Sequence, residues 1–246
     1  MYLKTADEIT KENPDIVIIP VGSIEQHGPH LPVMTDWAIA TEMGKRVAEK
    51  MNAFLLPALP ISTCREQMGK KGTVWMEPTT FYQMLTDIIV NLKLQGFRKV
   101  GIVQCHGGIF IMTPIVRDLN AKYNPDLMAS VVDTCNLNDI LFAEGILESN
   151  KELHAGECET SCMLAIAPES VHMDRAVDFV PTVPRSYLNY GSIFRASECG
   201  VWGEPSLATA EKGERILSRC AELIVEEMNK AFSYMEKKEK INYSNF

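Results

Sequence analysis

The sequence predicts an α/β protein built as a three-layer sandwich, with a mostly parallel sheet between two layers of helices. Short β-branched apolar runs at residues 15–21, 99–105 and 127–133 have the composition of strands that are buried on both faces. Segments with helical spacing lie between these runs, and this alternation implies right-handed crossovers that cover both faces of a sheet. The 246 residues show no repeat or linker, so we expect a single domain over residues 1–246.

The helices are expected where apolar residues recur every three or four positions. In residues 37–51 these are Ile39, Met43, Val47 and Met51. A second helix is expected at 80–94, with Thr79 or Thr80 as its N-cap and Gly96 beyond its end. Further helices are expected at residues 113–122, 138–147, 159–167 and 206–237.

Two segments lack a regular pattern. Residues 54–61 form an apolar run, but Pro57 and Pro60 predict an irregular segment or an edge strand. Residues 181–203 are rich in Pro, Gly, Ser and aromatic residues, which predicts a long loop.

Composition excludes several classes of function. The net charge is -8 and no basic run occurs, so we expect no nucleic-acid partner. No apolar run approaches the roughly 20 residues of a membrane span, and residues 1–13 lack the order of a signal peptide. The seven cysteines are scattered without a CxxC pair, as is typical of proteins from a reducing compartment. We therefore expect a cytoplasmic protein with no membrane partner.

The first cluster of polar residues follows the strand at 15–21. Glu25 and His27 are two residues apart, so in extended backbone their side chains point the same way. Carboxylate and imidazole donors on one side suit a divalent cation such as zinc or manganese. Asp36, at the start of the next helix, is placed to bridge two ions; the alternative is a plain N-cap, which Asp also favours.

Two further clusters contain His106 and His154. His106 ends the strand at 99–105 and is followed by two glycines, which allow close backbone approach, although a lone histidine there is also typical of a structural residue. His154 precedes Glu157 and Glu159 at the start of a helix, where carboxylates also serve as caps. The interpretation as a site makes one glutamate a metal ligand and His154 an acid/base residue.

The three clusters together favour a binuclear metal site, because parallel strands place ligands beyond their carboxyl ends. Different chemistries fit less well. Ser23 does not lie in the GxSxG of a nucleophile elbow. Cys105 and His106 are adjacent on a strand, so their side chains should point to opposite faces. Neither a dinucleotide fingerprint nor a Walker loop is present.

These motifs resemble those of the creatininase (creatinine amidohydrolase) family. Residues 21–32 (VGSIEQHGPHLP) with Thr35 and Asp36 look like its signature, residues 104–108 (QCHGG) like its second motif, and residues 154–161 (HAGECETS) like its third. Residues 203–205 and 208–213 resemble its C-terminal block. The likeness extends in order over roughly residues 15 to 230, and the first motif is highly specific.

The resemblance implies a three-layer α/β fold that holds two divalent ions per chain (Zn, Mn or Fe), in a homo-oligomer that is often a hexamer. Carried over by position, it implies metal ligation by five residues, with Asp36 as the bridge, and proton transfer by His154, with a less defined part for Glu157. The implied ligands are Glu25, His27, Asp36, His106 and Glu159.

The expected activity is metal-dependent hydrolysis of a small-molecule substrate, a cyclic amide, by a metal-activated water. Gln104, Cys105 and Ile109 depart from the family's second motif, and the three tryptophans do not match those that cover creatinine in the named enzyme. A second expectation is C–C ring opening of an oxidised inositol, which the polar loop at 185–195 would serve. A metal-dependent isomerase or lyase would use the same donors, as would a metal- or ligand-binding protein without turnover. The sequence does not indicate which residues bind the substrate.

Overall fold

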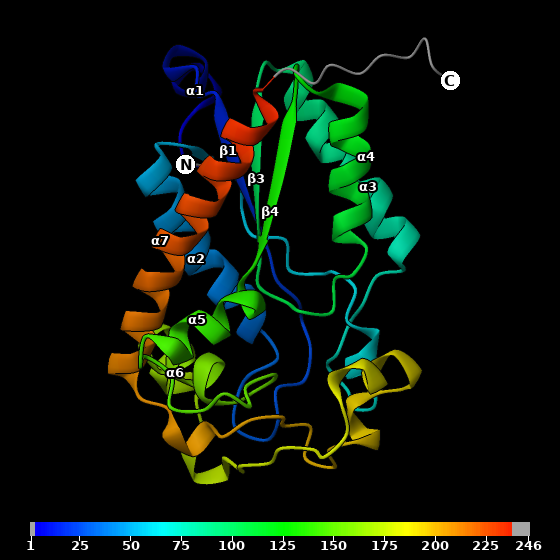
Figure 1. The fold of residues 1–246 in the computed structure, drawn as a ribbon, viewed down its shortest axis with the longest axis vertical. Coiled ribbons are helices and arrows are strands. Elements are labelled where there is room, and N and C mark those ends of the chain that lie inside the picture. The colour runs from blue at the N-terminus through cyan, green and yellow to red at the C-terminus, as the bar shows by residue number, and fades with distance from the viewer. Residues whose placement is uncertain (1–2, 238–246) are drawn as a thin grey trace.

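The structure is a computed structural model that describes residues 3–237, and in this part of the chain four strands form one parallel sheet (Figure 1). The sheet order is β2-β1-β3-β4. Val21 pairs with Gln104, and Gln104 with Asp133, so three strands end at the same edge. The strands are β1 (Ile16–Val21), β2 (Phe54–Leu55), β3 (Lys99–Gln104) and β4 (Met128–Asp133). The predicted α/β class is confirmed.

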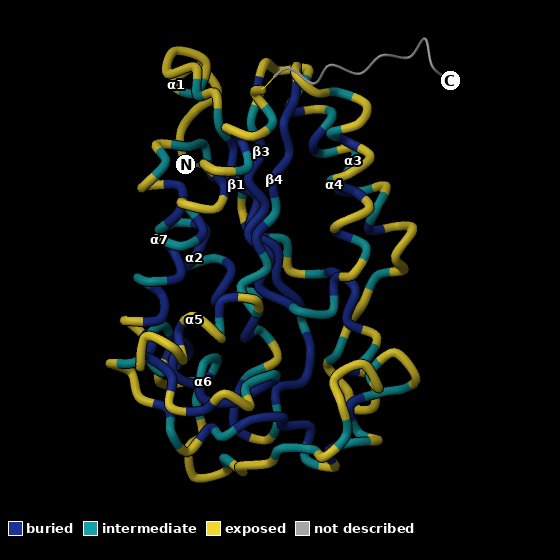
Figure 2. The backbone as a smooth tube through the Cα atoms, in the orientation of Figure 1, coloured by how far each residue is buried: buried dark blue, intermediate teal, exposed yellow. Residues whose placement is uncertain are grey.

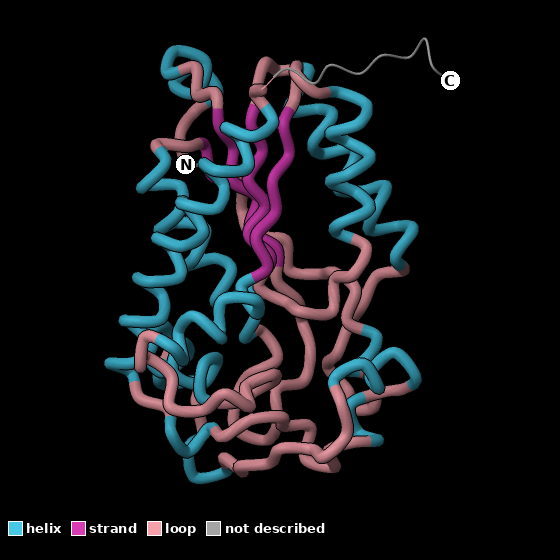
Figure 3. The backbone as a smooth tube through the Cα atoms, in the orientation of Figure 1, coloured by secondary structure: helices cyan, strands magenta, loops and turns pink. Residues whose placement is uncertain are grey.

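Helices cover both faces of the sheet and complete three layers (Figures 1 and 3). Helices α2 (Thr35–Met51) and α7 (Ala210–Met235) pack on one face, and α3 (Pro78–Leu94) and α4 (Met112–Tyr123) on the other. Helices α5 (Asn138–Ala143) and α6 (Glu157–Ile166) lie beyond the carboxyl edge, with α6 against α7. A short helix α1 (Ala6–Glu12), which the sequence did not predict, precedes β1.

The sheet separates two apolar cores, because successive strand residues point to opposite faces. Ile18 packs with the residues of α2 and α7, whereas Val17 and Ile19 pack with those of α3 and α4. All three are fully buried, and the strands lie at the centre of the buried region in Figure 2. A sheet with helices packed on both faces therefore has strands that are apolar at nearly every position.

Most differences between the predicted and the observed ends of helices have local causes. Helix α3 begins at Pro78, which is favoured in the first turn, so its N-cap is Glu77 and the predicted caps are wrong. The helix expected at 138–147 ends at Ala143, and Gly145 follows with φ 68°. Helix α6 begins at residue 157 rather than 159. Helix α7 begins at 210 rather than 206, where the Thr209 side chain accepts from the Lys212 N–H.

The irregular segments follow the prediction and lie near the carboxyl edge of the sheet. In the run 54–61, Phe54 and Leu55 pair with β1 as an edge strand, and Leu59 forms an isolated bridge with Val21. The loop at 181–203 contains two short 3-10 helices, η5 (Arg185–Tyr190) and η6 (Ile193–Arg195). Another, η1 (Arg65–Gln67), lies between β2 and α3 and contacts η6. Within residues 3–237 no helix has the length and apolar character needed to cross a membrane.

Candidate metal centre

The loop after β1 carries Glu25 and His27 inward, against the first turn of α2. Gly22 allows this approach, since a Cβ there would lie 2.6 Å from the backbone of Asp36. Glu25 and His27 are buried. His27 Nδ1 lies 3.1 Å from the Glu25 carbonyl oxygen, which can only accept, so this nitrogen donates. The other ring nitrogen, Nε2, faces the carboxylates.

Asp36 lies between two histidines. Its Oδ1 is 3.0 Å from His27 Nε2, and its Oδ2 is 3.1 Å from His106 Nδ1. The Ser23 hydroxyl lies 2.9 Å from Asp36 Oδ2 and 2.7 Å from Glu25 Oε2. The N-cap of α2 is Met34, so Asp36 does not cap its helix. Instead, each of the two oxygens of its carboxylate faces a different imidazole ring.

His106 follows β3 and is the second of the two histidines that face Asp36. Gln104 Nε2 donates to the His106 carbonyl over 3.0 Å, which holds the turn after the strand. His106 Nδ1 lies 3.2 Å from Glu25 Oε2, and its Nε2 lies 2.9 Å from Glu66 Oε1. Glu66 belongs to η1 and was not found by sequence reasoning.

The glutamate side chains of the third motif, residues 154–161, lie in two different places. Glu159 accepts from the Ala155 N–H, and its Oε2 lies 3.7 Å from His27 Nε2. Ala155 has φ 52°, an uncommon backbone conformation for a residue with a side chain. The structure does not bring Glu157 to the cluster: its carboxylate accepts from Lys212 Nζ over 2.6 Å and from two backbone N–H groups.

His154 lies beside Glu25 and His27. Its Nε2 lies 2.8 Å from the Gln26 carbonyl oxygen and therefore donates to it. Its Nδ1 lies 3.5 Å from Gln67 Nε2, an amide donor, and 3.7 Å from Glu25 Oε1. The His154 and His27 rings have centroids 4.4 Å apart. This tautomer leaves Nδ1 as an acceptor on the inner side.

Within the described residues, three sets of three side chains each bring one donor atom to within 4.8 Å of the others. The set Glu25, Asp36, His106 and the set His27, Asp36, Glu159 share only Asp36. The third set is Glu25, His27, His154. Glu25 Oε1 is also buried without a hydrogen-bond partner in this part of the chain. We call the five side chains of the first two sets the carboxylate–histidine cluster.

Burial and mutual charge shift the pKa values of the cluster. Burial raises the pKa of Glu25, and it raises the pKa of Glu159 to about 7. Burial lowers the pKa of His27, but Asp36 and Glu159 outweigh this and raise it to about 10. His154 differs, because burial and the neighbouring His27 both lower its pKa. Glu25 and Glu159 thus require positive charge nearby to be ionised. His154, by contrast, stays neutral.

A cavity opens on one side of the cluster, and we call it the site cavity. Arg185 lines it, and its Nη2 donates to the Gly107 carbonyl over 3.1 Å. Arg185 begins the polar loop that the sequence associated with an oxidised inositol, whereas Glu66 and Gln67 come from an irregular segment in which no periodic pattern indicated a site. The lining residues are Glu66, Gln67, His106, Gly107, Gly108, Phe110, Cys135, Leu153, His154, Glu159, Arg185 and Leu188.

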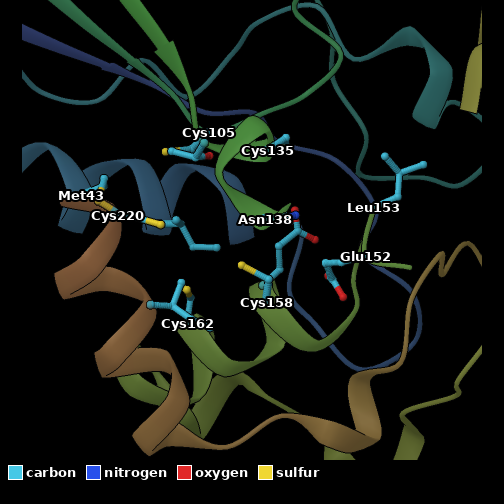
Figure 4. A pocket seen from close by; sticks show the side chains of 13 residues that line it. Met43, Cys105, Cys135, Asn138, Glu152, Leu153, Cys158, Cys162 and Cys220 are labelled. Carbon is cyan, nitrogen blue, oxygen red and sulfur yellow. The ribbon is translucent and has the colours of Figure 1, made fainter. Parts of the chain in front are cut away.

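A second cavity, the thiol cavity, adjoins the first and shares Cys135, Leu153 and Glu159 with it. Figure 4 shows the sulfur atoms that gather around it from several elements. Burial raises the pKa of most of these thiols, and for Cys158 the neighbouring Cys162 thiol raises it first and burial second. Its cysteines are Cys105, Cys135, Cys158, Cys162 and Cys220.

Fold and site together define an α/β enzyme class with a buried carboxylate–histidine centre beyond the carboxyl ends of parallel strands. A family model described as creatinine amidohydrolase matches residues 2–228. The chain therefore belongs to the creatininase family, whose members are hydrolases.

Two individual proteins and one solved structure are similar to this chain over most of its length. The creatinine amidohydrolase of Pseudomonas putida is 30% identical over 234 residues, which cover 88% of this chain and 90% of that protein. The 3-dehydro-scyllo-inosose hydrolase of Thermotoga maritima is 31% identical, covering 81% of this chain and 72% of that protein. A solved structure described as creatininase with Mn has a TM-score of 0.76 and 28% identity, covering 93% of this chain and 96% of that one.

Proposed function

We propose that this protein is a binuclear metal-dependent hydrolase that opens a small, cyclic amide. The observation that carries the proposal is the position of Asp36, which turns one oxygen to His27 and the other to His106. In this proposal Asp36 would be shared by two divalent ions, which are zinc, manganese or iron. Glu25 and His106 would hold one ion with it, and His27 and Glu159 the other.

The residues present fit such ions by several criteria. Carboxylate oxygens and imidazole nitrogens are the donors that zinc and manganese accept. A buried carboxylate oxygen without a partner, such as Glu25 Oε1, is costly unless a cation meets it. When bound, paired divalent ions polarise a carbonyl oxygen and make a water acidic enough to attack it near neutral pH.

His154 is the residue that we propose for proton transfer. It lines the site cavity, donates from Nε2 to the Gln26 carbonyl, and keeps Nδ1 as the acceptor, where only the long contact with the Gln67 amide competes with a proton. Its lowered pKa leaves it neutral, as an acceptor must be. The sequence also predicted such a role for Glu157, but that carboxylate is paired with Lys212 outside the cluster. We therefore assign the proton transfer to His154 alone.

Metal analysis and a substrate screen test the proposal. We expect about two divalent ions per chain by plasma emission after gentle purification, as the two donor sets require. We also expect ring opening of a lactam or related cyclic amide by protein supplied with zinc, manganese or iron. A metal content near zero that soaking does not restore would contradict the binuclear centre. Full metal content without turnover of any substrate would instead favour a binding protein.

A second candidate reaction is the ring opening of an oxidised inositol by C–C cleavage. The inosose hydrolase of Thermotoga maritima supports it, because its identity to this chain equals that of the creatinine amidohydrolase within one per cent. In addition, no tryptophan is among the residues that line the site cavity within the described chain. Including inososes beside lactams and formamides in the same screen separates the two reactions.

A further inference from the structure

Glu66 faces the outer ring nitrogen of His106. The inner nitrogen, Nδ1, lies 3.2 Å from Glu25 Oε2 and 3.1 Å from Asp36 Oδ2. The outer nitrogen, Nε2, lies 2.9 Å from Glu66 Oε1, within hydrogen-bonding distance. Both of these outer atoms are buried, and neither forms an aligned hydrogen bond within residues 3–237, so they approach closely without hydrogen-bond geometry. Buried polar atoms are normally hydrogen-bonded, and at this separation each can serve as the partner of the other.

Gly108 makes room for this pairing. A Cβ at position 108 would overlap both Glu66 Oε1 and His106 Nε2. Gly108 is not one of the glycines with positive φ in the described chain, so its backbone conformation does not require glycine. The space that a side chain would need is instead filled by the Glu66 carboxylate. The second glycine of the QCHGG motif therefore has a steric explanation.

The turn that carries Glu66 is fixed by its neighbour Gln67. Gln67 is buried, and its Oε1 accepts from Gln26 Nε2 over 2.7 Å. The Gln67 backbone N–H also donates to the Cys64 carbonyl over 3.0 Å. The Glu66 side chain is only 14% exposed. Its carboxylate is therefore held in place and does not move freely on the surface.

We propose that Glu66 is a positioning residue that fixes the tautomer and the ring orientation of His106. By accepting from Nε2–H, Glu66 keeps the proton on the outer nitrogen and leaves the Nδ1 lone pair for a divalent ion. A carboxylate behind a metal-binding histidine has this effect in many proteins, and its loss weakens metal affinity. The inference rests on the proposed function, because it needs an ion at Glu25, Asp36 and His106.

Metal affinity measured by competition with a chromophoric chelator tests this role without using activity. We expect Glu66→Ala to weaken the affinity for zinc by about 10- to 100-fold. Glu66→Gln should retain most of the affinity, because its amide oxygen still accepts from Nε2–H. Glu77→Ala is the matched control: Glu77 is 63% exposed, pairs with Arg65 and should leave the affinity unchanged.

The possible outcomes separate the two claims. Wild-type protein that binds no divalent ion would overturn the proposed function, and this inference with it. Wild-type protein that binds zinc, with Glu66→Ala equally tight, would overturn the inference alone. Equal losses in Glu66→Ala and Glu66→Gln would also overturn it, since the accepting oxygen would then be irrelevant. Thermal melts of each variant establish that the protein compared is folded.

A double-mutant cycle with Gly108→Ala tests the steric link. Alone, Gly108→Ala should weaken zinc binding, because the new Cβ displaces the Glu66 carboxylate from His106. In the Glu66→Ala background the same substitution should cost less, since part of the crowding is gone and the pairing is already lost. Interacting positions show such non-additivity, whereas independent ones do not. An equal loss in both backgrounds would contradict the proposed coupling.

Discussion

The site cavity and the thiol cavity are neighbours with shared walls but opposite chemistry. Both lie beyond the carboxyl edge of the sheet, and Cys135, Leu153 and Glu159 line both. In the cluster beside the site cavity, neighbouring carboxylates raise the pKa of His27 and His106 although burial lowers it. In the thiol cavity, burial raises the pKa of the Cys105 and Cys220 thiols and outweighs the opposing charge of Arg219 at Cys220.

This contrast shows that burial alone does not create a reactive centre. A buried thiol without a nearby cation behaves as a small hydrophobic side chain. Buried carboxylates are tolerated only with compensating charge, and His27 and His106 supply it here. A site is thus expected where groups of opposite charge converge, and core packing where only thiols do. The following substitutions test this difference.

The largest effect is expected from Asp36→Asn. An amide cannot hold two cations as a carboxylate does, so turnover should fall to the background of metal-free protein while the chain stays folded. Metal content, melting temperature and rate should be measured on one preparation. Asp139→Asn is the control, because Asp139 also lies in the first turn of a helix but is exposed. Normal turnover of Asp36→Asn would show that Asp36 is not a bridge.

His154→Ala should leave metal content unchanged and lower the rate by roughly a hundredfold to ten-thousandfold, the usual contribution of a positioned acid or base. If His154 is instead a ligand, metal content should fall together with the rate. If it is only structural, the melting temperature should fall while the folded fraction turns over normally. His172→Ala serves as the control, since His172 is exposed. A fully active variant with normal metal would contradict the role.

The sequence predicted the fold and most of the cluster for physical reasons. Strands buried on both faces must be apolar throughout, so β1, β3 and β4 were visible, and their carboxyl ends meet at one edge. Polar residues directly after such strands, including Glu25 and His106, could therefore be expected to converge. Asp36 could be placed because it begins a helix that returns from this edge, and Glu159 was implied by the family resemblance.

The rest of the site depends on contacts that no local pattern records. Glu66 and Arg185 come from irregular segments, whose path is set by packing and not by periodicity. Glu157 and Glu159 are two residues apart on a helix, which separates them by about 200°. Only one of them can face the cluster, and the residue pattern alone left both open, whereas the family resemblance implied Glu159. The structure directs Glu159 inward and Glu157 toward Lys212.

Arg185→Ala should affect substrate binding more than metal binding. Apart from the histidines, Arg185 is the one basic residue that lines the site cavity within the described chain, and most of its guanidinium donors are free for a substrate oxygen. Loss of a hydrogen bond from a charged group should raise KM by roughly 10- to 100-fold. Arg195→Ala, in the same loop but not in the lining, is the control. An unchanged KM would exclude Arg185 from substrate contact.

The smallest effect on catalysis is expected from Cys162→Ala, which removes one sulfur from the thiol cavity. Cys162 is buried, so its loss leaves a small void and should lower the free energy of unfolding by about 1 kcal/mol. For a chain of this length, that change corresponds to a melting temperature about 2–4 °C lower. Metal content and rate should not change, because the thiols contribute no charge to the cluster. Cys199→Ala, at a half-buried cysteine outside both cavities, is the control. A loss of bound metal in Cys162→Ala alone would mean that the thiol cavity belongs to the centre, and the contrast between the two cavities would fail.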